Sequence, residues 1–190
     1  MSLSDTEISS LRAELVRYSD HILDLVKFAV TATSALIGFG LSRGDHTAGY
    51  ILLVPLLILA PSLSLAMNRR QNIVRIATYL RAFAGDRFEY ESRLWQLRQR
   101  RDIPWVSYQL STLQVFIITG FVCIALSFLF LLGEGLLLLV PGLAGLAWIG
   151  FSIGQWRMSR RILMGGGLDG ILFNAWRQTL GEEEKSASPT

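Results

Sequence analysis

The residues of this sequence that could carry out chemistry are few and widely separated. A single cysteine, Cys123, excludes an internal disulfide and a cysteine-based zinc site. The histidines, His21 and His46, have no metal-site spacing with each other or with Cys123. The apolar stretches contain neither a nucleophile with a base partner nor a set of metal ligands. We therefore expect no catalytic residue, no metal, no cofactor and no enzymatic activity.

One charged pair, Asp24 and Lys27, stands at the start of an apolar stretch. The two residues are three apart, which is within side-chain reach on a helix. One interpretation is an ion-gating pair at the mouth of a pore. The other is that Lys27 extends to the lipid headgroups with Asp24 beside it. We favour the second interpretation, because both residues lie in the first turn of the apolar stretch.

Long apolar stretches must position these residues. Hydrophobic residues make up 51% of the chain and its mean hydropathy is +0.40, which is high for a water-soluble domain. Charged residues gather in blocks outside the apolar stretches, as in multi-pass membrane proteins. The sequence therefore predicts one all-α integral membrane domain, with four transmembrane helices in two hairpins. The predicted spans are residues 25–41, 50–67, 113–132 and 136–155.

Helices are also predicted outside the spans. Residues 1–21 form an apolar stripe with helical spacing, and neither Pro nor Gly separates them from the first span. Residues 69–104 form a basic helical connector. Residues 157–180 hold a hinge at Gly165–Gly167 and a helix with Trp176 on its apolar side, before a disordered tail at 181–190. No removable signal peptide is expected at the N-terminus.

The positions of the basic residues predict an orientation. The turn after the first span contains only Arg43, and the turn at Gly133–Gly135 contains no basic residue. The remaining basic residues lie in the N-terminal region, the connector and the C-terminal region. Because basic residues accumulate on the cytoplasmic side, we expect both termini and the connector to be cytoplasmic. The preference for arginine over lysine suggests a GC-rich bacterial genome, and hence the inner (plasma) membrane.

Small residues mark candidate packing faces on two of the predicted spans. The first span has pairs of small residues four apart, and the fourth span has a GxxxG pair. Small residues let helix backbones approach closely in lipid. We therefore expect the first span to be buried among other helices, and a homo-oligomer to form. The candidate packing residues are Ser34, Gly38, Gly142, Gly150 and Gly154.

The second span has a different character. It is dominated by Leu and Ile, so we expect much of its surface to face lipid. Pro55 and Pro61 each remove a backbone donor, which predicts kinks.

The connector carries an apolar stripe with helical period, which includes Ile76, Leu80 and Phe83. This stripe can dock on the N-terminal helix, on another connector helix, on the headgroup layer or on a neighbouring subunit or protein partner. Tyr79, Phe83 and Trp95 are the candidate docking residues, because aromatic rings bury a large area. The connector's arginines alternate with acidic residues, which does not favour nucleic acid as a partner.

The connector also resembles a known kind of sequence. The pattern Arg75-Ile76-x-x-Tyr79-Leu80-x-x-Phe83, followed by Arg93-Leu94-Trp95, looks like that of uncharacterised bacterial membrane proteins with two hairpins. The outline is also similar to small multi-helix membrane effectors of bacterial antiviral systems. The second resemblance implies assembly in the membrane and its perturbation.

Two functional expectations follow. The first is a non-enzymatic, oligomeric inner-membrane protein whose cytoplasmic helices bind a partner, in its strongest form a regulated pore or membrane-perturbing effector. The alternative is a small-molecule or ion channel or transporter without ion-coupling residues, since no ionisable residue lies away from the span ends. The alternative requires inward-facing hydroxyl groups at Thr31, Thr33, Ser34, Ser62, Ser64 and Thr119.

Overall fold

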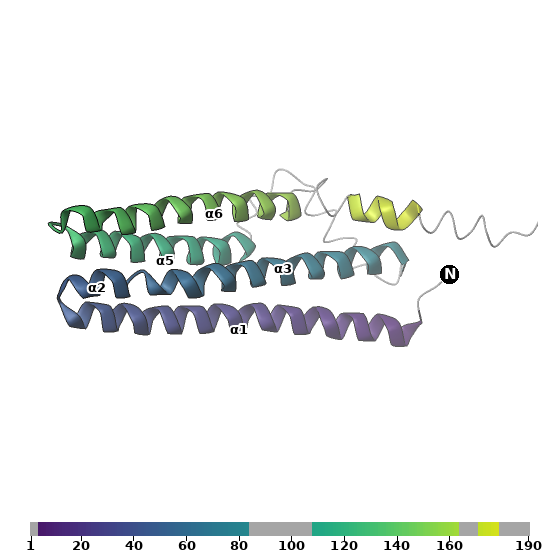
Figure 1. The fold of residues 1–190 in the computed structure, drawn as a ribbon. Coiled ribbons are helices and arrows are strands. Elements are labelled where there is room, and N and C mark those ends of the chain that lie inside the picture. The colour runs from purple at the N-terminus through teal and green to yellow at the C-terminus, as the bar shows by residue number, and fades with distance from the viewer. Residues whose placement is uncertain (1–3, 84–107, 164–170, 179–190) are drawn as a thin grey trace, which may run out of the picture. The chain divides into compact units, whose positions relative to one another are not determined.

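The computed structural model describes residues 4–83, 108–163 and 171–178 (Figure 1). In these ranges the chain forms helices and turns and no strand, so the predicted all-α class is confirmed. The elements are α1 (Asp5–Arg43), α2 (His46–Ile51), α3 (Val54–Phe83), α5 (Tyr108–Leu131), η2 (Gly135–Leu138) and α6 (Leu139–Leu163). Residues 171–178 form a further helix, here named the C-terminal helix.

Four helical stretches of the described chain are long and apolar enough to cross a membrane. They are Asp5–Arg43, His46–Phe83, Leu113–Leu131 and Gly135–Ser159. Each of the predicted spans overlaps one of them. The protein is therefore compatible with a multi-pass membrane protein.

The chain divides into two compact units. The apolar unit comprises Ile22–Met67 and Val106–Arg157. The terminal unit comprises Met1–His21, Asn68–Trp105 and Met158–Thr190. The candidate spans supply the apolar unit, whereas the chain ends and the continuation of α3 supply the terminal unit.

Helix α1 contains both the predicted N-terminal helix and the predicted first span in 39 continuous residues. Ser4 caps it, because its Oγ accepts a hydrogen bond from the Glu7 backbone N–H at 3.2 Å. Asp5 and Glu7 place negative charge in the first turn, where the helix dipole favours it. With no Pro inside it and no Gly before Gly38, nothing in the sequence interrupts this helix earlier.

The two prolines of the second predicted span have different effects. Pro55 has no N–H to donate to the carbonyl of Ile51, and the chain passes through a turn at Leu52 and Leu53 between α2 and α3. There the Leu53 N–H bonds to the Tyr50 carbonyl at 3.1 Å, a three-residue step. Pro61 lies inside α3, which continues through it to Phe83.

The turn after α5 depends on two glycines. Gly133 and Gly135 have φ angles of 109° and 55°, which other L-residues rarely adopt. Glu134 bonds back to the Leu131 carbonyl at 3.1 Å. The predicted turn thus closes α5 and starts η2, and α6 then runs past its predicted end at residue 155 to Leu163.

Within the apolar unit, the Leu-rich second stretch is the most buried one, which corrects the expectation that it faces lipid. Leu52, Leu59 and Leu63 are each exposed by 1% or less. In the first stretch, between residues 22 and 43, only Ala29, Thr33 and Gly40 are buried. The expectation of a buried first span was therefore wrong for the single chain. Its physical reason is that apolar side chains of any size are acceptable to lipid, so size alone does not reveal which helix is central.

The close contacts of the apolar unit fall at other glycines. A Cβ built on Gly120 in α5 would overlap the indole of Trp148 in α6. The same indole donates from Nε1 to the Ile117 carbonyl at 3.2 Å, which holds the ring in place. A Cβ on Gly49 in α2 would lie 2.7 Å from Leu131 Cγ in α5. Absence of a side chain at these two positions lets α6 and α2 approach α5.

These contacts predict opposite effects for two matched substitutions. Gly120→Ala should lower the melting temperature in detergent, because the added methyl overpacks a held indole at a cost of about 1–3 kcal/mol. Gly150→Ala, where no atom lies within 4 Å of the new Cβ, should leave the melting temperature unchanged or raise it. Equal melting temperatures for the two variants would contradict the packing of Trp148 on Gly120.

Candidate functional site

The charged pair at Asp24 and Lys27 forms as the spacing predicts. Lys27 Nζ lies 3.8 Å from Asp24 Oδ1, and the side chains are 66% and 70% exposed, respectively. An ion pair this exposed contributes little to stability. A role for this pair at a pore mouth stays a prediction.

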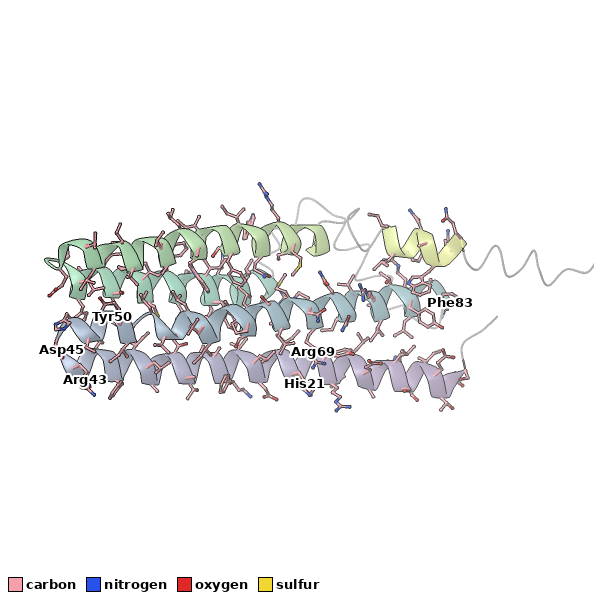
Figure 2. All side chains as sticks on the ribbon, in the orientation of Figure 1. His21, Arg43, Asp45, Tyr50, Arg69 and Phe83 are labelled. Atoms are coloured by element: carbon pink, nitrogen blue, oxygen red, sulfur yellow. The ribbon has the colours of Figure 1, made fainter. Side chains whose placement is uncertain are left out.

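Among the described residues, no group of three or more His, Cys, Asp or Glu side chains is placed to hold a metal ion. Cys123 is buried in the apolar unit. His46 begins α2, and Arg43, Asp45 and Tyr50 lie around the same turn (Figure 2).

The candidate packing residues are mostly unused within the chain. A Cβ on Gly38, Gly150 or Gly154 would have no atom within 4 Å, and Ser34 is exposed. Gly142 alone faces a neighbour, Phe128, whose Cζ would lie 3.9 Å from a Cβ at that position. These small residues form open faces of α1 and α6, and their use by a second copy stays a prediction.

The six hydroxyl groups that a transport pathway would need occupy different environments. Thr31 and Ser34 are exposed, whereas Thr33 and Ser62 are buried. Thr119 donates to the backbone carbonyl of Val115 at 2.7 Å. Ser64 accepts a hydrogen bond from Gln155 Nε2 at 3.4 Å. These hydroxyl groups therefore do not share one surface of the described apolar unit.

The terminal unit holds a more organised group of side chains. Leu80 of α3 is fully buried against Ile8 of α1, with Leu11, Leu15 and Ile76 packed around them. The apolar stripe of the connector therefore lies on the chain's own N-terminal helix, one of the arrangements that the sequence left open. The first connector helix is also continuous with the second span, because both belong to α3.

Aromatic rings extend this core toward the end of α3. The Tyr79 and Phe83 rings stack at 4.6 Å between centroids, and the Tyr79 hydroxyl donates to Glu7 Oε1 at 3.3 Å. Trp176 of the C-terminal helix meets Tyr79 at 5.2 Å and Phe83 at 6.0 Å, in both cases edge to face. Such pairs add about 0.5–1.5 kcal/mol beyond area burial. Trp95, the third candidate docking residue, lies outside the described residues.

Cations pack on several of the rings in the terminal unit. The Arg81 guanidinium lies 3.9 Å from the centroid of Phe173, and Arg177 lies 5.3 Å from the same centroid. Arg69 lies 5.3 Å from the Tyr18 ring of α1. A guanidinium within about 6 Å of a ring centroid is attracted to the face of the ring. The arginines of α3 thus hold both the N-terminal and the C-terminal helix.

Arg70 differs from the other arginines of this segment. Its side chain is 7% exposed, although the sequence pattern placed it off the apolar stripe with the solvated cations. Burial lowers the pKa of Arg70 from its ordinary value, because a low-dielectric environment disfavours the charged form. Sequence reasoning missed this burial, since the stripe alone does not show how far neighbouring helices extend around α3.

Comparison with known proteins assigns no family to the chain: no family model, no curated protein and no solved structure matches it. The resemblance of the connector to two-hairpin membrane proteins stays an expectation. Function must therefore be inferred from the geometry of the chain itself.

The core of the terminal unit predicts a large effect at Leu80. Leu80→Ala should destabilise the terminal unit by about 2–5 kcal/mol, because it leaves a cavity against Ile8. Hydrogen exchange of the backbone amides in residues 8–15 measures this effect, which should appear as lost protection. Arg75→Ala, at an exposed position of the same helix, is the matched control and should preserve protection. Equal protection in both variants would contradict the packing of α3 on the N-terminal part of α1.

Proposed function

We propose that this chain is a non-enzymatic, oligomeric protein of a bacterial inner membrane, with two membrane hairpins and both termini in the cytoplasm. Its terminal unit binds a cytoplasmic protein partner. In the strongest form of the proposal the assembly is a regulated pore or a membrane-perturbing effector. One observation carries it: α1 and α3 each change, along one unbroken helix, from apolar side chains to a packed aromatic and cationic end.

The exposed surface of the apolar unit supports the membrane part of the proposal. Large apolar side chains are exposed on each of its long helices, among them Phe28 at 60%, Leu57 at 76%, Ile118 at 60% and Leu143 at 66%. Water-soluble proteins rarely leave extended apolar patches uncovered. Lipid tails are the solvent that such a surface fits.

The open glycine face of α6 supports the oligomer. Gly150 and Gly154 lie four residues apart with no atom near their Cβ positions, and Leu146 and Ile153 are exposed beside them. In lipid, apolar contact alone gives little association, whereas small residues allow close backbone approach. A second copy of α6 fits this face.

The exposed face of α1 supports the pore form. Thr31, Ser34 and Gly38 follow at spacings of three and four, so they share one side of the helix, and all three are exposed. In an assembly, this side can turn two hydroxyl groups toward a common centre. A polar lining that only an oligomer completes makes the pore dependent on assembly.

Substitution on the glycine face of α6 tests the oligomer. Gly150→Ile with Gly154→Ile should reduce the assembly to monomers in size-exclusion chromatography with light scattering, because the branched side chains prevent close approach. Leu136→Ile, at an 81% exposed position before α6, is the control and should keep the assembly. An assembly that survives the double substitution would overturn the proposed interface.

Expression in cells with a potential-sensitive dye tests the pore. The wild-type chain and Leu136→Ile should depolarise the membrane under the activating condition, and the Gly150→Ile/Gly154→Ile variant should not. Absence of depolarisation by the wild-type chain under every condition would reduce the proposal to a membrane scaffold.

A further inference from the structure

The end of α3 carries a surface that a short helix fits, and the chain itself supplies an occupant. We name Tyr79, Arg81 and Phe83 the α3 docking surface. The C-terminal helix places Phe173 on Arg81 and places Trp176 against Tyr79 and Phe83. Two aromatic residues three positions apart thus meet the surface from one side of one short helix.

We propose that the α3 docking surface binds a partner protein through a short helix with two aromatic residues one turn apart, and that the C-terminal helix is a displaceable internal mimic of this partner. The proposal deepens the proposed function, since it names the surface and the chemistry of the cytoplasmic partner. In the resting chain the mimic covers the surface, so a partner must displace it.

The length of the mimic argues that it is displaceable. The helix comprises residues 171–178, and helices shorter than about 12–15 residues are marginal in water without tertiary contacts. Its helical form therefore depends on its docking. Release of its two rings also releases its fold, which makes the free and docked states close in free energy.

The fit of the mimic is also imperfect. The indole Nε1 of Trp176 is shielded from solvent and has no hydrogen-bond partner. A buried donor without an acceptor weakens a contact, because the donor loses its bond to water and gains no other. A partner helix that presents an acceptor to its own indole, or a phenylalanine in its place, occupies the surface without this defect.

The tether sets the expected size of the effect. A short flexible linker gives an attached segment an effective concentration of about a millimolar. For a segment whose own dissociation constant is about 100 µM, such a tether weakens a competing copy in solution about tenfold. The mimic therefore acts as a threshold against weak partners, and a partner with tighter binding overcomes it.

A labelled peptide with the sequence of residues 169–180 tests the proposal on the full-length chain in nanodiscs. Fluorescence polarisation should show about tenfold tighter binding to the Phe173→Ala/Trp176→Ala variant than to the wild-type chain, because the variant leaves the surface uncovered. A peptide with alanine at both aromatic positions, and empty nanodiscs, are the controls. Equal binding to both chains, or binding to the variant no greater than to empty nanodiscs, would overturn the proposal.

Two further measurements keep the result interpretable. Adding Arg81→Ala to the double variant should abolish peptide binding, while hydrogen exchange in residues 8–15 confirms that the terminal unit is still folded. Trypsin should cleave after Arg177 more rapidly in the double variant than in the wild-type chain, and equal rates would show that the helix is not held. Neither readout depends on oligomer size or on membrane potential, so failure here is distinguishable from failure of the proposed function.

Discussion

Close approach at Gly120 is the constraint on which the apolar unit depends. In lipid, apolar side chains do not gain by leaving solvent, so helices associate through shape and through hydrogen bonds. The Trp148 indole supplies both, since it lies on Gly120 and donates to the Ile117 carbonyl. The contact joins α5 to α6, and Gly49 joins α2 to α5 in a similar way. The buried Leu residues of α2 and α3 are then positioned by these few places where no side chain intervenes.

The sequence was sufficient for the helices and not for their packing. Period, length and hydropathy identified every long apolar helix, and Ser4 and Pro55 mark an observed helix start and an observed interruption. The choice of central helix failed, because Leu-rich and small-residue spans are equally acceptable to lipid. The glycines that pack also differ from those that the motif selected. A GxxxG pattern describes one helix, whereas the contact at Gly120 depends on a Trp that lies 28 residues away in the sequence.

The terminal unit was predicted in part for a related reason. The stripe through Ile76 and Leu80 identified the buried face of the connector, and its location against Ile8 was one of several open arrangements. Trp176 was assigned to an apolar helix face without a partner, since no local pattern links residues almost a hundred positions apart. The burial of Arg70 was likewise invisible, because it depends on the surroundings of α3 rather than on its spacing.

The central claim is that apolar helices cross the membrane and leave the aromatic terminal unit in the cytoplasm. Single cysteines at Ser9, Thr47 and Asn174, each an exposed position, in a Cys123→Ser background test this claim most directly. With an impermeant thiol reagent added outside intact cells, the account predicts labelling at Thr47 alone, and labelling at Ser9 and Asn174 only after permeabilisation. Labelling of Ser9 or Asn174 in intact cells would contradict the account.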